Sequence, residues 1–156
     1  MTGGGSSIPE VQRLLSVLAA GRRCAEIGTA FGEGAAAIAS TAASLVTVEV
    51  DPERAAVARR RLNGLANVEL FVADWRAVLP ARAPFEFLFF DGGGLDKSPE
   101  AIDLVGPGGL LLKDDLTPGR AGRDPVRELL FEHPELVAVE LLTTPTTAAV
   151  VAARRR

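Results

Sequence analysis

Short apolar runs alternate along the chain with longer segments whose apolar residues recur at helical spacing. The fourth run, Phe85 to Phe90, is apolar along most of its length, as expected for a strand buried on both faces of a sheet. The pattern predicts strands at 23–27, 45–50, 68–72, 85–90 and 110–112, with a closing pair at 136–142 and 148–153. It predicts helices at 11–20, 34–43, 52–62, 96–104 and 125–132.

This alternation of strand and helix predicts one α/β domain over residues 1–156. We expect a Rossmann-like, doubly wound and mostly parallel sheet with an antiparallel C-terminal edge. Asp51 has the residue type of an N-cap and precedes a first-turn proline, which marks the start of the third helix. Residues 1–9 are predicted to be a flexible lead-in, and 106–109 a turn before the fifth strand.

Composition narrows the classes of partner. The net charge is −3, whereas nucleic-acid binders usually carry a basic patch, so we expect no nucleic-acid partner. No apolar stretch reaches membrane-spanning length, and no charged-then-apolar leader opens the chain. The single cysteine, Cys24, rules out an internal disulfide. These features predict a cytoplasmic protein without a membrane partner.

A glycine-rich turn follows the first predicted strand, and Glu49 ends the second. In a doubly wound sheet this combination binds an adenosine-bearing ligand, because the turn lets the backbone approach the ligand and the acid accepts hydrogen bonds from ribose hydroxyls. The dinucleotide pattern counted from Gly28 needs a third glycine at Glu33, which disfavours a nicotinamide cofactor. The alternative is a turn with a purely structural role. The candidate binding residues here are Glu26, Gly28, Thr29, Ala30, Phe31, Gly32 and Glu49.

With Glu26 before it, the turn resembles motif I of class I S-adenosylmethionine-dependent methyltransferases, with alanine in place of the middle glycine. The resemblance runs from about Glu10 to Ala153. It implies that Glu49 and the neighbouring Val50 hold the ribose, and that Asp74, after Ala73, meets the adenine amino group. Trp75 would stack on the adenine, with core packing as the alternative.

Carboxylates end the fourth and fifth strands, at Asp91 and at Asp114–Asp115. Because the carboxyl ends of parallel strands share one edge, we expect these three side chains to come together, where repulsion favours a proton or a hard cation such as Mg²⁺ or Ca²⁺. The alternatives are that Asp91 only orients the cofactor and that the other two cap a loop.

The carboxylates also resemble those of the catechol- and caffeoyl-coenzyme A-type O-methyltransferases. That resemblance implies that Asp91 is catalytic and, with Asp114, a metal ligand; Asp115 stands where those enzymes have asparagine. Their general-base lysine is replaced by glycine, and the nearest lysines are Lys97 and Lys113, so no base is assigned.

The leading hypothesis is a methyltransferase that moves a methyl group from S-adenosylmethionine to a hydroxyl on a small molecule. One alternative is a non-catalytic module that binds the same cofactor. A nicotinamide-dependent oxidoreductase and a nucleic-acid amine methyltransferase fit the motifs less well. The exposed final strands and the short front segment would favour a homodimer.

Overall fold

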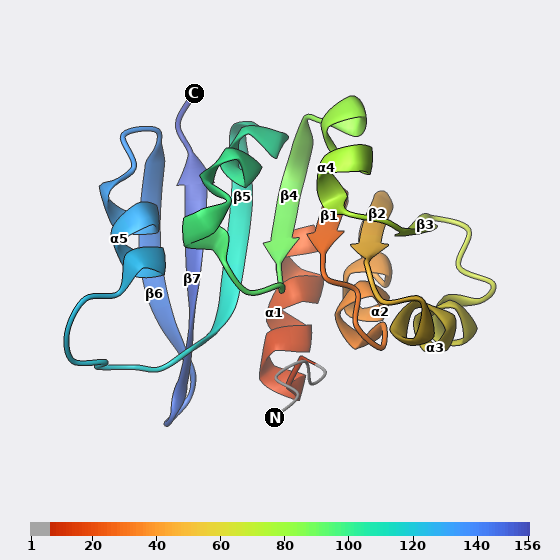
Figure 1. The fold of residues 1–156 in the computed structure, drawn as a ribbon, viewed down its shortest axis with the longest axis horizontal. Coiled ribbons are helices and arrows are strands. Elements are labelled where there is room, and N and C mark those ends of the chain that lie inside the picture. The colour runs from red at the N-terminus through yellow and green to blue at the C-terminus, as the bar shows by residue number, and fades with distance from the viewer. Residues whose placement is uncertain (1–6) are drawn as a thin grey trace.

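In the computed structural model, residues 7–156 are described. They form one seven-stranded sheet with helices on both faces, which confirms the predicted fold class (Figure 1). The strands are β1 (Arg23–Ile27), β2 (Ser44–Glu49), β3 (Val68–Val72), β4 (Phe85–Phe90), β5 (Val105–Leu116), β6 (Leu136–Thr144) and β7 (Thr147–Arg154). The α-helices are α1 (Pro9–Ala19), α2 (Glu33–Ala39), α3 (Pro52–Leu62), α4 (Trp75–Val78) and α5 (Pro125–Glu132).

The sheet order is β3-β2-β1-β4-β5-β7-β6. Strands β1 to β5 pair in parallel, whereas β7 is antiparallel to both β5 and β6. In Figure 1 the arrowheads of β1, β2 and β4 point down and that of β7 points up. The antiparallel C-terminal edge is therefore as predicted. The chain order reverses between β1 and β4, which makes this the topological switch point where such sheets bind ligands.

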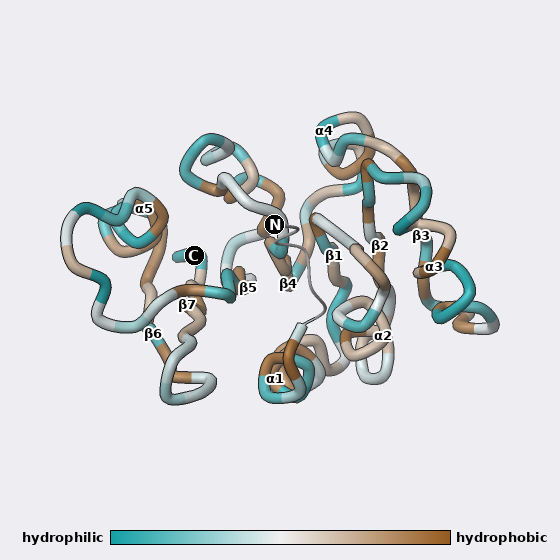
Figure 2. The backbone as a smooth tube through the Cα atoms, turned by 60° about the horizontal axis from the view of Figure 1, so that its bottom comes forward, coloured by the Kyte–Doolittle hydropathy of each residue, from teal (hydrophilic) through white to brown (hydrophobic). Residues whose placement is uncertain are grey.

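Two apolar clusters hold the layers together. One lies between the sheet and the helices α1, α2 and α3, and contains Leu15, Ile38, Leu62 and the β4 residue Phe89. The other lies between the opposite face and the segments around α4, α5 and the 3₁₀ helix Pro99–Leu104. Figure 2 shows α1 and α2 on one side of the sheet and α4 and α5 on the other. Successive strand residues alternate between the two clusters, which fixes the side to which each candidate side chain points.

Four local predictions differ in kind from the structure, and the helix predicted over 34–43 ends earlier, at Ala39. The predicted lead-in extends to residue 9, but α1 begins at Pro9, since proline suits the first helical position and Glu10 favours the first turn. Residues 1–6 of that prediction lie outside the described part of the chain. The helix predicted over 96–104 is two short 3₁₀ helices. The turn predicted over 106–109 lies inside β5, where the pairing with β4 shifts register between Phe85 and Phe87.

The fourth difference is α4, a single turn that the pattern did not predict. Four residues are too few for a helical period, and its start signal is the N-cap Asp74, whose side chain accepts a hydrogen bond from the backbone N–H of Arg76 at 2.8 Å. Between residues 7 and 156, no helix is both long and apolar enough for a membrane crossing.

Candidate functional site

The glycine turn leaves β1 at the switch point and is pressed against the loop after β4. Gly28 has a φ of 92°, and a Cβ at this position would lie 3.0 Å from the backbone nitrogen of Gly92. The same turn is tied to β2, because the backbone N–H groups of Gly28 and Thr29 both donate to the carbonyl of Val48 at 3.0 and 3.1 Å. Only glycine fits there without moving the chain.

The pairing register brings the candidate residues into two rows across the sheet. Glu26 pairs with Thr47 and with Phe89, and Phe89 pairs with Leu112, so these four residues form an inner row. Side chains two residues further along each strand point to the same face of the sheet. The outer row, at the carboxyl edge, is therefore Glu49, Gly28, Asp91 and Asp114. It consists of three carboxylates and Gly28, whose Cβ side is packed against the backbone of Gly92.

The inner row is linked to the glycine turn by side-chain hydrogen bonds. Glu26 is fully buried, and its Oε2 accepts a hydrogen bond from the hydroxyl of Thr47 at 2.6 Å. The Thr47 hydroxyl is in turn 2.6 Å from the hydroxyl of Thr29. Burial raises the pKa of Glu26 well above its usual value. Among the described residues its Oε1 has no hydrogen-bond partner, and a Cβ on Gly34 would lie 2.6 Å from this atom, so a side chain at Gly34 would displace the Glu26 carboxyl. Sequence reasoning missed Thr47, whose one signal is a hydroxyl within an apolar strand.

Glu49 joins the end of β2 to the glycine turn. Its Oε2 accepts from the backbone N–H of Ala30 at 2.8 Å and its Oε1 from that of Asp51 at 3.0 Å. An ionised carboxylate offers about four acceptor positions, so each oxygen of Glu49 keeps one free lone pair. Two free acceptor positions at a strand tip beside the glycine turn fit the two adjacent hydroxyls of a ribose. The residues present therefore fit an adenosyl ligand.

Asp91 and Asp114, the other half of the outer row, are partly or fully buried and repel each other. Burial, and then repulsion from Asp114, raises the pKa of Asp91 to about 7. Burial also raises the pKa of Asp114, whose Oδ1 is buried and has no hydrogen-bond partner within residues 7–156. These two side chains come together as predicted, at the ends of neighbouring strands.

The predicted metal site is not formed in the described chain. Within residues 7–156, no three or more His, Cys, Asp or Glu side chains are grouped so that they could hold a metal ion. Asp115 has a φ of 58° and is exposed, at a register shift between β5 and β7, whereas Asp114 is buried. The charge of Asp115 still acts on the other two carboxylates: burial is the largest cause of the raised pKa values of Asp91 and Asp114, and repulsion from Asp115 is a smaller one.

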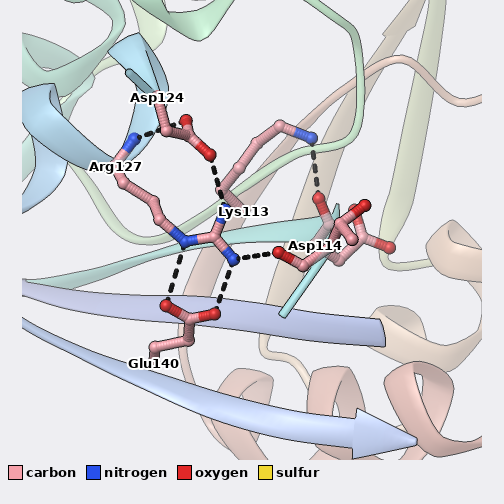
Figure 3. Close-up of polar contacts among 6 residues, drawn as sticks. Lys113, Asp114, Asp124, Arg127 and Glu140 are labelled. Atoms are coloured by element: carbon pink, nitrogen blue, oxygen red, sulfur yellow. Dashed lines mark hydrogen bonds and ion pairs between the residues drawn. The ribbon is translucent and has the colours of Figure 1, made fainter. Parts of the chain in front are cut away.

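Lys113 is a buried charge that the sequence did not mark as unusual. It is 7% exposed, and its Nζ donates to the backbone carbonyl of Asp114 at 2.9 Å, as Figure 3 shows. Alternation along β5 directs it to the face opposite the Asp114 carboxylate. Lys97, the other lysine considered, is exposed in a 3₁₀ helix.

The residues predicted to hold the adenine lie at the tips of β2 and β3. The Ala73 backbone N–H donates to the Glu49 carbonyl at 3.0 Å, and Val50 is 68% exposed beside it. Asp74 caps α4 and forms an ion pair with Arg76 at 3.7 Å.

The two predicted aromatic residues differ in exposure. Phe31 is partly exposed, with the Arg54 guanidinium 5.8 Å from its ring centre. Trp75 is buried in the cluster under α4, with the Arg76 guanidinium 4.6 Å from its ring centre. This burial matches the core-packing alternative for Trp75 rather than stacking on a ligand.

Comparison with known proteins finds relatives among methyltransferases, although no family model matches the sequence. The chain is 36% identical over 108 residues to the protein-L-isoaspartate O-methyltransferase of Burkholderia pseudomallei (strain 668), an alignment that covers 65% of this chain and 33% of the relative. The matched region thus spans about a third of the length of that relative.

Solved structures share the fold over nearly the whole chain. An O-methyltransferase from Bacillus cereus, in complex with SAH, matches with a TM-score of 0.77 and 21% identity, over 98% of this chain and 84% of that one. The tRNA (m1A58) methyltransferase TrmI from Aquifex aeolicus matches with a TM-score of 0.75 and 20% identity, over 97% and 70%. Sequence identities this low support a shared fold and nothing beyond it. The chain therefore has the fold of the class I S-adenosylmethionine-dependent methyltransferases.

Proposed function

We propose that this protein is an S-adenosylmethionine-dependent methyltransferase that methylates a hydroxyl group on a small molecule. The observation that carries the proposal is the outer row, in which Glu49 and Asp91 flank Gly28 at the tips of neighbouring strands. Beside the glycine turn, Glu49 has a free acceptor position on each oxygen for the ribose hydroxyls. The methyltransferase relatives support the same activity.

When bound, S-adenosylmethionine supplies a methyl group on a positively charged sulfur, ready for direct displacement. The chain's own contribution is to orient and to hold charge. The carboxylate of Asp91, at the end of β4, faces this positive charge. With a pKa raised to about 7, Asp91 is also suited to take the proton that the acceptor hydroxyl loses near neutral pH. The proposal includes no metal ligands, because within residues 7–156 no three such side chains are grouped closely enough to hold a metal ion.

Calorimetry with S-adenosylhomocysteine tests the binding half of this proposal. Glu49→Gln replaces one acceptor oxygen by a donor, and we expect it to weaken binding more than ten-fold. Glu53→Gln, at an exposed acid in the first turn of α3, is the matched control and should bind like the unmodified protein. The proposal would be contradicted if the unmodified protein failed to bind, or if the Glu49→Gln variant bound equally well. Bound cofactor without turnover over a broad panel of hydroxyl compounds would favour a non-catalytic module.

A second acceptor class follows from the relatives named protein-L-isoaspartate O-methyltransferase. That name points to a carboxyl group in a protein as the acceptor. Methyl transfer to a peptide with one isoaspartate, but not to the same peptide with aspartate, would assign this activity to the chain. Transfer to neither peptide, with S-adenosylhomocysteine still bound, leaves the small-molecule hydroxyl as the acceptor.

A further inference from the structure

At the Asp114 end of the outer row, one buried oxygen lacks a hydrogen-bond donor among the described residues. Asp114 is 5% exposed and its Oδ1 has no partner among the described residues. A buried carboxylate oxygen without a donor is costly, which indicates that something that binds there supplies the donor. β2, which carries Glu49, is three strand spacings from β5, about 14 Å at about 4.8 Å each. Asp114 thus lies beyond the ribose position, on the side of the acceptor.

The charge around this oxygen is negative on its face of the sheet. Asp91 stands next to Asp114 in the row; burial, and then repulsion from Asp114, raises the pKa of Asp91, and Asp115 adds to the repulsion. The ion pairs formed within residues 7–156 include neither of these two carboxylates. Lys113 offsets part of this negative charge, since its ammonium acts to lower the pKa of both carboxylates, but its Nζ is bound to the main-chain oxygen of Asp114. A carboxylate or phosphate on the acceptor would therefore meet like charge, and a cation would meet opposite charge.

We propose that Asp114 selects acceptors that carry a protonated amine and excludes acceptors that carry a carboxylate. This inference rests on the proposed methyltransferase function and narrows its acceptor to cationic hydroxyl compounds. An ammonium group has three N–H donors, so it can satisfy the free Oδ1 of Asp114 and reach the Asp91 carboxylate as well. The charge-assisted hydrogen bond gives Asp114 a role in specificity that does not require a metal ion.

The test measures binding rather than turnover. Protein saturated with S-adenosylhomocysteine is titrated near neutral pH with benzylamine, benzyl alcohol and benzoate, which differ in charge but little in size. Amide NMR shifts of residues near 91 and 114 report the affinity. We expect benzylamine to bind at least ten-fold more tightly than benzoate, with the alcohol between them. Benzoate binding as tightly as benzylamine, or no benzylamine binding, would overturn the inference.

Two variants locate the selection. Asp114→Asn should reduce the preference for the amine to less than three-fold while the affinity for S-adenosylhomocysteine stays unchanged, which shows that the variant is folded. Asp115→Asn is the matched control: asparagine tolerates the left-handed conformation, and the side chain is exposed, so solvent screens its charge and most of the preference should remain. A preference that survives Asp114→Asn contradicts the inference. If S-adenosylhomocysteine itself does not bind the unmodified protein, the proposed function fails instead.

Discussion

Gly28 occupies the most constrained backbone position in the site. Its φ of 92° is strained for any other residue, and the backbone of Gly92 lies 3.0 Å from where a Cβ would be. The position also lies between Glu49 and Asp91 in the outer row. One residue thus sets the close approach of two loops between the two carboxylates proposed to bind the ligand.

Gly28→Ala is therefore expected to lower stability by about 1–2 kcal/mol through backbone strain and to weaken S-adenosylhomocysteine binding more than ten-fold. Gly64→Ala is the matched control, because Gly64 has a φ of 85° but nothing within 4 Å of its Cβ position. Thermal unfolding and calorimetry on both variants separate the two effects. Equal affinity for S-adenosylhomocysteine in Gly28→Ala and Gly64→Ala would show that the turn at Gly28 does not shape the binding site.

Asp91 makes stability depend on pH. Its pKa is about 7 in the folded protein against an ordinary value of 3.8, so the folded state binds the proton more tightly than the unfolded state does. The contribution of Asp91 to stability is complete below pH 4 and is lost as pH rises through 7. Asp91→Asn has no such charge, and we expect it to be more stable than the unmodified protein by about 1–3 kcal/mol at pH 8 and equally stable near pH 4. Denaturant unfolding at both pH values measures this difference; a constant difference would contradict it.

At this scale the sequence indicated where the individual acids lie, because each follows an apolar run; their roles stay predictions. It could not predict that Asp114 is buried and Asp115 exposed, which depends on a local left-handed residue at a register shift. Trp75 is similar, since its sequence position suits either a ligand or the core, and the packing of α4 decides.

Among the elements, α5, β6 and the segment after β5 are joined at one side chain, Arg127. Its guanidinium binds both carboxylate oxygens of Glu140 in β6, at 3.0 and 2.6 Å, and donates to the backbone carbonyl of Thr117 at 2.8 Å. It also pairs with Asp124, the N-cap of α5, as Figure 3 shows. The network raises the pKa of Arg127 and lowers those of both acids. The Arg127 network thus fixes α5 against β6 near Asp114, as Figure 3 shows.

Arg127→Met is expected to lower the free energy of unfolding by about 1–3 kcal/mol, because two partly buried carboxylates lose their partner. Arg127→Lys should recover little of this, since an ammonium lacks the planar fork that binds Glu140. Arg123→Met is the control on the same side of the molecule; Arg123 is 80% exposed and pairs with Glu128, so its loss should cost less than about 0.5 kcal/mol. Equal losses for Arg127→Met and Arg123→Met would contradict this account of α5.

Element types followed from periodicity, whereas several boundaries did not. β5 extends back to Val105 through a Gly-Pro-Gly-Gly sequence that resembles a turn, because pairing with β4 resumes after an irregularity. The short helices after Trp75 and before Val105 have too few turns to produce a periodic pattern.

For the whole molecule, the alternation of strands and helices predicted a parallel sheet, and the order of strands then placed four chain segments in one row. That order is a tertiary property, since Glu49 and Asp114 are far apart in sequence and only the sheet aligns them. The cytoplasmic location stays a prediction. So does the homodimer, although the edge strand β6 exposes Val137, Val139 and Leu141.

The most direct test of the central claim is a crystal structure of the protein with S-adenosylhomocysteine. We predict that the ribose hydroxyls bind the carboxylate of Glu49, that the ligand passes over Gly28, and that its sulfur lies on the side of Asp91. An adenosyl group bound anywhere else, or an outer row closed by the protein's own side chains, would contradict the account.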